Sequence, residues 1–225
     1  MNELHMPADS FDILMKPQYK GIANLVIADP PYGGIVYADW NDEECYDNIS
    51  GLLQHIMHKD STAYVWGGIG TWKNRPFLKW LSEIESKTDL KIRNLITWSK
   101  KRAYGKKDNY LFTREECVML IKGKPVFNIP LLDTKRGYEG YNAKYPAKSE
   151  FLRRTNVWTD ITEIFKGKIH ECQKPEQLHN VMITTSSNEG DQVIDPFAGC
   201  GGVAAACRKL NRDCISVELN PCQQL

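Results

Sequence analysis

The tetrapeptide Asp29-Pro30-Pro31-Tyr32 combines residue types suited to holding an amino group on a planar ring. The Asp29 carboxylate can accept a hydrogen bond from an amine. The two prolines fix the backbone angle φ and lack an N–H that would occupy a nearby carbonyl oxygen. The ring of Tyr32 offers a flat face on which a base can stack. The motif therefore predicts a holder for an exocyclic amine, although alone it also fits a strand that ends in a proline-rich turn.

A second candidate site lies in the glycine-rich segment Asp195-Pro-Phe-Ala-Gly-Cys-Gly201. Glycines let the backbone approach a ligand closely at the start of the helix that follows. Glu218 comes 23 positions after Asp195, where an acid can accept hydrogen bonds from both ribose hydroxyls of a nucleoside. The spacing departs from G-x-G-x-x-G, which disfavours a dinucleotide. S-adenosylmethionine, a nucleoside cofactor without phosphate, fits this turn better.

A third segment, His170-Glu-Cys-Gln-Lys-Pro-Glu-Gln-Leu178, stands directly before a predicted helix. Lys174 could neutralise a carboxylate and Gln173 could hydrogen-bond one. Taken alone, the segment is simply the start of a helix that carries a lysine.

Alternating strands and helices are expected to position these three segments. An apolar run over 24–28 predicts a buried strand that places Asp29 at its carboxyl end, where open α/β sheets bind their ligands. The remaining pattern predicts strands over 62–66, 92–98, 117–121, 192–195 and 214–218, and helices over 42–58, 74–86, 175–185 and 202–210. We therefore expect an α/β fold with a doubly wound, mainly parallel sheet.

The segment 101–160 differs from the rest of the sequence in charge and pattern. From Lys100 to Arg154 there are 14 basic and 6 acidic residues, whereas the whole chain has a net charge of only +1. Aromatic residues are interleaved with the basic ones, at Tyr104, Tyr110, Phe112, Phe127, Tyr138, Tyr141 and Tyr145. Beyond the predicted strand 117–121 the segment has little periodicity. This composition suits a nucleic acid, through phosphate contacts and base stacking, or else an ordinary long surface loop.

Composition limits the remaining functional classes. With 225 residues and 42% hydrophobic residues, the chain is expected to form one domain with an insertion. It has no apolar stretch as long as a membrane span and no signal peptide, which favours the cytoplasm. Its seven cysteines are scattered and form no Cys-x-x-Cys pair, so we expect free thiols and no metal site.

The three segments, in this order, resemble the amino-methyltransferases that modify exocyclic nitrogens in DNA, in the permuted (beta) group whose catalytic motif precedes the cofactor motif. Asp29-Pro-Pro-Tyr32 matches the catalytic motif and Asp195-Pro-Phe-Ala-Gly-Cys-Gly201 the cofactor loop. His170-Glu-Cys-Gln-Lys-Pro175 is similar to a His-Pro-Thr-Gln-Lys-Pro segment of the family, with Glu171 and Cys172 as departures. Ala8-Asp9-Ser10 resembles a Gly-Asp element, and Arg114-Glu115-Glu116 a weaker landmark.

The resemblance implies a seven-stranded, Rossmann-like methyltransferase sheet formed by 1–100 and 161–225, with a target-recognition region inserted at 101–160. It implies methyl transfer from S-adenosylmethionine to N6 of adenine in double-stranded DNA, after the base has been flipped out. Asp29, Pro30, Pro31 and Tyr32 would be catalytic. Asp9 would bind the cofactor's adenine, Lys174 its carboxylate, Phe197 its adenine or ribose, and Glu218 its ribose. The implied cofactor site also includes Ser10, Asp29, Asp195, Ala198, Gly199, Gly201 and Asn220.

Several alternatives stay open at this stage. N4 of cytosine fits the same amine holder, and Asp29 in place of serine favours adenine. RNA is a rival substrate, and a silent nucleic-acid-binding subunit is a rival of a different class. Methylation of a protein glutamine is disfavoured by the order of the motifs. The short recognition region suggests a homodimer or a partner subunit, and the family resemblance suggests a prokaryotic or phage source. The recognition sequence, and whether a restriction nuclease accompanies the enzyme, are not readable from the residues.

Overall fold

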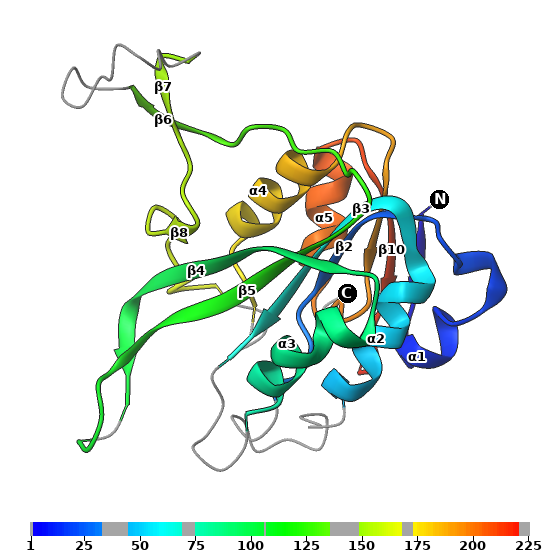
Figure 1. Ribbon diagram of the computed structural model, residues 1–225. Coiled ribbons are helices and arrows are strands. Elements are labelled where there is room, and N and C mark those ends of the chain that lie inside the picture. The colour runs from blue at the N-terminus through cyan, green and yellow to red at the C-terminus, as the bar shows by residue number, and fades with distance from the viewer. Residues whose placement is uncertain are drawn as a thin grey trace.

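A mixed β-sheet with helices on both faces forms the centre of the computed structural model (Figure 1). The structure describes residues 2–32, 45–68, 75–105, 107–135, 149–167 and 173–220. Within these residues the main sheet has eight strands, in the order β1-β10-β9-β2-β3-β5-β4-β8. Their bounds are β1 Glu3–His5, β2 Ala23–Ala28, β3 Met57–Gly67, β4 Lys91–Tyr104, β5 Phe112–Lys122, β8 Val157–Trp158, β9 Gln192–Asp195 and β10 Asp213–Val217.

Most neighbouring strands of this sheet are parallel. The pairs β1–β10, β10–β9, β9–β2, β2–β3 and β4–β8 are parallel, whereas β5 is antiparallel to both β3 and β4. From β2 the chain runs to β3 on one side, and it later returns to β9 on the other side. The sheet therefore has a topological switch point between β2 and β9, which is where doubly wound sheets open a crevice for ligands.

Helices pack against the sheet because each buries one apolar face. On one face lie α1 Ser10–Ile13, α2 Cys45–Ile56 and α3 Pro76–Lys87, with the single-turn 3-10 helix η1 Pro17–Tyr19. On the other face lie α4 Glu176–Ser186 and α5 Gly202–Lys209. The two hydrophobic clusters are separated by the sheet, and the alternating side chains of its strands supply both of them. The predicted doubly wound α/β architecture is confirmed.

Several predictions about the elements differ in detail from the structure, most often at the bounds of helices and strands. The described part of the main sheet has eight strands instead of seven, because the two-residue β8 joins its edge. The helix predicted to reach His58 ends at Ile56, because Met57 already pairs with Ala23 of β2. The last strand ends at Val217, so that Glu218 follows the strand and is not part of it. Residues 42–44 of the predicted helix lie outside the described residues.

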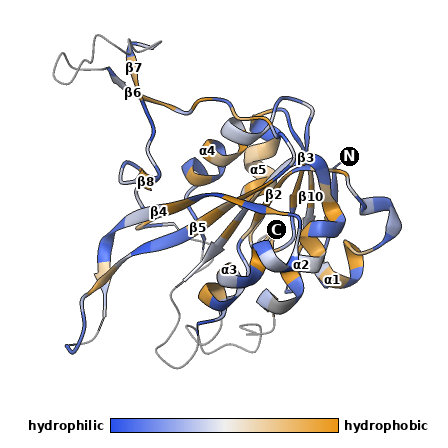
Figure 2. Cartoon of the chain, viewed as in Figure 1, coloured by the Kyte–Doolittle hydropathy of each residue, from blue (hydrophilic) through white to orange (hydrophobic). Residues whose placement is uncertain are grey.

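The segment 101–160 contains more regular structure than its sequence suggested. The predicted boundary at Lys101 falls inside β4, and β4 and β5 project from the body of the protein as one long hairpin (Figure 1). The tip of this hairpin is hydrophilic (Figure 2). Strands β6 Leu131–Lys135 and β7 Phe151–Arg153 form a separate two-stranded sheet. Tyr138, Tyr141 and Tyr145 lie outside the described residues.

No helix in the described part of the chain is both long enough and apolar enough to cross a membrane.

Candidate active site

The tetrapeptide Asp29-Pro-Pro-Tyr32, called the acceptor motif below, and the segment 195–201, called the cofactor loop, meet at one edge of the sheet. Asp29 directly follows β2, Asp195 is the last residue of β9, and Glu218 directly follows β10. These three strands are parallel neighbours, so their carboxyl ends lie at the same edge. Residues 166 positions apart in sequence, Asp29 and Asp195, are thereby placed on the two sides of the topological switch point.

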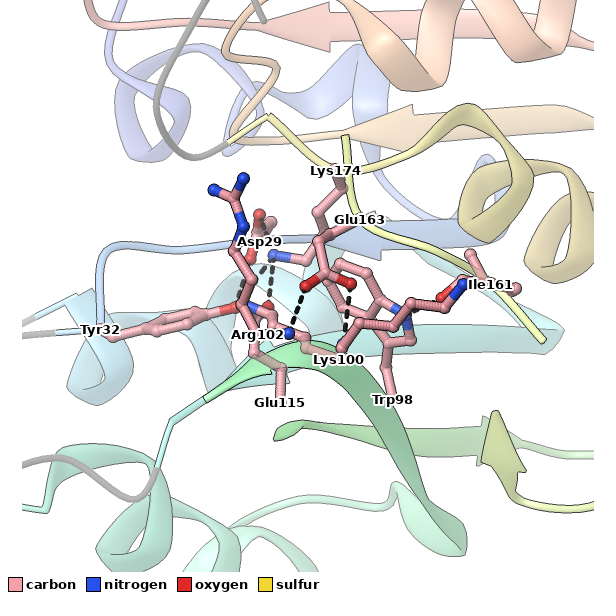
Figure 3. Close-up of polar contacts among 10 residues, drawn as sticks. Asp29, Tyr32, Trp98, Lys100, Arg102, Glu115, Ile161, Glu163 and Lys174 are labelled. Atoms are coloured by element: carbon pink, nitrogen blue, oxygen red, sulfur yellow. Dashed lines mark hydrogen bonds and ion pairs between the residues drawn. The ribbon is translucent and has the colours of Figure 1, made fainter. Parts of the chain in front are cut away.

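Both oxygens of the Asp29 carboxylate have partners (Figure 3). The ammonium of Lys174 donates to Oδ2 at a distance of 2.5 Å. The hydroxyl of Tyr32 donates to Oδ1 at 2.8 Å and accepts from the Lys174 ammonium at 3.0 Å. Between them, Pro30 is buried and Pro31 half-buried. The first and last side chains of the motif are therefore hydrogen-bonded to each other, which holds the Asp29 carboxylate beside the Tyr32 phenol.

Lys174 lies on the acceptor side of the site, two residues before α4. Its side chain is only 8% exposed. Besides Asp29, its Nζ contacts Oε2 of Glu115 at 3.3 Å. Sequence reasoning assigned Lys174 to a cofactor carboxylate, which stays a prediction, and in the structure its partners are two carboxylates of the protein itself.

Glu115, on β5, is the residue that sequence reasoning did not assign to the site. Its Oε1 forms an ion pair with Lys100 of β4, and its Oε2 lies 3.3 Å from the hydroxyl of Tyr32. A signal was present in the sequence, since Glu115 and Glu116 precede the apolar run 117–121 and acids that enter a buried strand need partners. The identity of those partners was not predictable, because Lys174 is 59 positions away.

Charges in this cluster stabilise one another. Burial would raise the pKa of Glu115, but the ammonium groups of Lys174 and Lys100 lower it to about 2. Burial would lower the pKa of Lys174, but the carboxylates of Asp29 and Glu115 raise it above its ordinary value. Burial, with the nearby carboxylates of Asp29 and Glu115, also raises the pKa of Tyr32. The lysine and Glu115 are therefore charged at neutral pH, and the tyrosine is a neutral phenol.

Three tryptophans form a rigid wall behind the cluster. The ring of Trp66 makes edge contacts with Trp98 and Trp158, at centroid distances of 6.3 and 6.5 Å. The Lys174 ammonium lies 4.9 Å from the Trp66 ring centroid and 5.4 Å from that of Tyr32, within the range of cation–π attraction. The wall excludes water from one side of the ammonium.

The segment after β8 closes the outer side of the cluster (Figure 3). Trp98 donates its indole N–H to the carbonyl of Ile161 at 2.8 Å. The Glu163 carboxylate accepts the backbone N–H groups of Lys101 and Arg102 at 2.9 and 2.7 Å. These contacts fix the β4 backbone directly after Lys100, and so they hold Lys100 where it can reach Glu115.

The cofactor loop is held by backbone hydrogen bonds and by two acids. The amide of Ala198 donates to the carbonyl of Val217 at 3.0 Å, which joins the loop to β10. Asp195 is 2% exposed, and burial raises the pKa of its carboxyl group well above the usual range. Its Oδ1 accepts the amide N–H of Phe197 at 3.2 Å. The loop is therefore preformed.

Glu218 connects the loop to the segment that follows β10. Its Oε2 accepts the amide N–H of Gly199 at 2.6 Å, and its Oε1 accepts that of Asn220 at 2.9 Å. Each carboxylate oxygen keeps a further lone pair for a ribose hydroxyl. Gly199 and Gly201 have φ angles of +51° and +74°, which favour glycine. A Cβ built at Gly199 would meet nothing within 4 Å, so a ligand can approach the loop there.

The N-terminal segment is joined to the same loop. Ser10 donates its hydroxyl proton to the carbonyl of Pro196, and the amide of Ala8 donates to the carbonyl of Glu218 at 2.8 Å. The Asp9 carboxylate caps α1 by accepting the amide N–H of Phe11 at 2.7 Å, and Asp9 is exposed. The Phe11 and Phe197 rings meet at 6.3 Å. Hydrogen bonds and ring contacts therefore join the N-terminal segment, the loop 195–201 and Glu218 into one group, whereas Lys174 and Asp29, also predicted to bind the cofactor, pair with each other on the acceptor side.

The described residues do not contain three or more His, Cys, Asp or Glu side chains arranged to hold a metal ion. Residues 170–172, which include two departures from the family pattern, lie outside the part that the structure describes.

Comparison with known proteins gives a family model and several relatives that match this chain. The family model N6_N4_Mtase, described as DNA methylase, matches residues 23–224. The type II methyltransferase M.HpaI of Haemophilus parainfluenzae is 28% identical over 221 residues, which cover 88% of this chain and 64% of that protein. The DNA adenine methyltransferase YhdJ of Escherichia coli (strain K12) is 26% identical over 224 residues, which cover 88% of this chain and 72% of YhdJ.

The fold has close counterparts among solved structures. The crystal structure of M1.HpyAVI in complex with SAM matches with a TM-score of 0.66 and 21% identity, and the match covers 98% of this chain and 95% of that chain. The chain covers a smaller share of the length of several curated relatives. This chain spans 64% of the length of M.HpaI, and 41% and 42% of two further type II methyltransferases.

Proposed function

This chain belongs to the DNA methylase family N6_N4_Mtase, and we propose that it transfers the methyl group of S-adenosylmethionine to the N6 amino group of adenine in DNA. The observation that carries the proposal is the meeting of Asp29 and the cofactor loop at the switch point of the sheet. An amine held at Asp29, after β2, and a nucleoside held by Glu218, after β10, would then lie at the same edge of the sheet.

Acceptor chemistry follows from the residues around Asp29. The lone pair of an exocyclic amine is delocalised into its ring, so the amine is a poor nucleophile. Hydrogen bonds from its two N–H groups to the Asp29 carboxylate and the Pro30 carbonyl would favour a pyramidal nitrogen and aim its lone pair. The Asp29 charge would also stabilise the positive charge that develops on that nitrogen. The Tyr32 ring, oriented by the hydrogen bond to Asp29, would stack on the base.

Bound S-adenosylmethionine would supply an electrophilic methyl group on a sulfonium. Glu218 would accept the ribose hydroxyls, since its two oxygens are already aimed by the amides of Gly199 and Asn220. Exposed Asp9 would accept a hydrogen bond from the adenine amine, and Phe197 would pack on the adenine or ribose. Ser10, Asp195, Ala198 and Gly201 would shape the pocket from behind.

Double-stranded DNA is the proposed partner, with the target base flipped out of the helix at a cost of a few kcal/mol. The projecting β4–β5 hairpin presents exposed aromatic side chains, with Tyr110 92%, Tyr104 61% and Phe112 46% exposed. It also carries Lys101, Arg102 and Lys107. We propose that the segment 101–160 contacts DNA through phosphates and stacked bases.

Cytosine N4 is the second candidate acceptor, because the family model covers both N6 and N4 methylases. Adenine is favoured by Asp29 at the head of the motif and by the name of the relative YhdJ, a DNA adenine methyltransferase. Mass spectrometry of nucleosides from methylated plasmid DNA separates the two products, and N4-methylcytosine alone would refute the choice of adenine. Methylation of RNA in preference to duplex DNA would refute the choice of DNA.

The decisive experiment replaces Asp29. We expect Asp29→Ala to abolish transfer of a tritiated methyl group to DNA while calorimetric binding of S-adenosylmethionine stays mostly intact. Asp29→Asn is a second variant, which keeps the size of the side chain if the alanine variant is unstable. The matched control is Asp89→Ala, which removes a surface carboxylate lying 3.5 Å from Lys122. Retained activity in both Asp29 variants would overturn the proposal, and wild-type protein that does not bind the cofactor would favour a silent subunit.

A further inference from the structure

One ammonium, that of Lys174, is shared between two carboxylates in the acceptor half of the site. Its Nζ lies 2.5 Å from Asp29 Oδ2 and 3.3 Å from Glu115 Oε2 (Figure 3). Only 8% of the Lys174 side chain is exposed, compared with 28% for Asp29 and 18% for Glu115. The ammonium is therefore largely removed from water and depends on these two carboxylates for its stabilisation.

This arrangement conflicts with the proposed task of Asp29. The target amine is a neutral donor, whereas the ammonium is a charged donor that already occupies the same carboxylate. Charge-assisted hydrogen bonds are roughly twice as strong as neutral ones, so the amine competes poorly while Lys174 remains in place. A positive charge also develops on the amine nitrogen during methyl transfer, and an ammonium bound to Asp29 would oppose that charge. Asp29 therefore has to exchange one partner for the other.

Glu115 is placed to make this exchange possible. Its Oε2 is the second carboxylate contact of the ammonium, and its Oε1 is held by Lys100. A shift of the ammonium from Asp29 to Glu115 needs only a small movement and keeps it against the faces of Trp66 and Tyr32. The four charged groups, two carboxylates and two ammoniums, sum to zero, so the shift leaves the net charge unchanged.

We propose that Glu115 is a positioning residue that receives the Lys174 ammonium when the target amine binds Asp29. The inference rests on the proposed methyltransferase function and adds a residue to it. No covalent bond changes in this step: one hydrogen bond to Asp29 is replaced by another, and Lys174 strengthens its contact with Glu115. Without the Glu115 charge, a largely buried ammonium would have Asp29 as its remaining carboxylate partner and would stay there.

The test compares Glu115→Gln with wild type at saturating DNA and saturating S-adenosylmethionine. We expect kcat to fall by about tenfold or more, with KM for the cofactor unchanged within about twofold, since the side-chain partners of Glu115 are Tyr32, Lys100 and Lys174 and not the residues proposed to hold the nucleoside of the cofactor. Glu115→Asp, which keeps the charge, should recover a substantial part of the lost kcat. The matched control is Glu83→Gln, which removes a carboxylate from an exposed ion pair with Lys87 on α3.

A double-mutant cycle with Lys174→Met separates this mechanism from a merely structural role. Once the ammonium is absent, the Glu115→Gln change should alter kcat by less than about twofold. Equal losses in both backgrounds, or no loss in the single variant, would overturn the proposal. If Lys174→Met is inactive, Glu115→Asp decides, and a kcat as low as that of Glu115→Gln would overturn the proposal. If Glu115→Gln does not fold, a kcat of Glu115→Asp about tenfold below that of wild type would overturn it. Wild-type protein without methyl transfer would instead refute the proposed function itself.

Discussion

Acidification is expected to destabilise the protein through one buried histidine. His179 on α4 is 7% exposed, and its ring lies beneath Gly202, the first residue of α5 after the cofactor loop. Burial, together with the Lys174 ammonium, lowers the pKa of His179 to about 4, from an ordinary value of 6.5. The folded protein therefore keeps this histidine neutral over a pH range in which the unfolded chain binds a proton.

The sign and the size of the effect follow from proton linkage. Because the pKa is depressed on folding, the stabilisation is complete above pH 6.5 and is lost as the pH falls from 6.5 towards 4. At about 1.4 kcal/mol per pKa unit, the free energy of unfolding should drop by about 2 kcal/mol at pH 5 and about 3 kcal/mol at pH 4.

Urea denaturation of wild type and His179→Phe, at pH 7.5 and at pH 5, measures this contribution. Phenylalanine keeps a ring against Gly202 but does not titrate, and the other four of the five histidines are the same in both proteins. The drop between the two pH values should therefore be smaller in the variant by about 2 kcal/mol. Drops that agree within about 0.5 kcal/mol would refute the assignment of a neutral buried His179.

Two further substitutions test the cofactor side and the packing beside the site. Glu218→Ala should weaken S-adenosylmethionine binding in calorimetry by about tenfold or more, because the ribose acceptor and the anchors of Gly199 and Asn220 are lost; unchanged affinity would contradict the assigned role. Gly67→Ala should lower the free energy of unfolding by about 1–3 kcal/mol, because a Cβ there would lie 2.2 Å from the ring of Phe77. In the control Gly51→Ala on α2 the Cβ meets nothing within 4 Å, so stability should hold or rise; equal losses in both glycine variants would contradict the packing argument.

Elements with a strong local pattern were predictable from the sequence. The apolar run before Asp29 and the strand over 192–195 were found because buried parallel strands read as short apolar runs. The helix after Lys174 was found through the proline at its start. These same elements position the acceptor motif and the cofactor loop.

Elements without such a pattern were missed. Strand β1 has three residues, Glu3-Leu-His5, and its pairing with Ile215–Val217 leaves no mark on its own sequence. The outer part of β4, residues 101–104, is exposed, so burial imposes no alternation of polar and apolar residues there. The ion pair of Lys174 with Asp29 joins positions 145 apart, and no local spacing predicts it.

The pairing of β1 with β10 has a consequence for how the protein folds during synthesis. The acceptor motif follows β2, which pairs with β3, so its immediate neighbours on that side are synthesised within the first third of the chain. The cofactor loop needs both β1 and β10, since the amide of Glu218 donates to the carbonyl of His5 at 3.0 Å. Strand β10 must leave the ribosome before this contact with β1 can form. Long-range closure of this kind slows folding, so β2 and β3 can pair in the nascent chain well before β1 and β10 close around the segment 195–201.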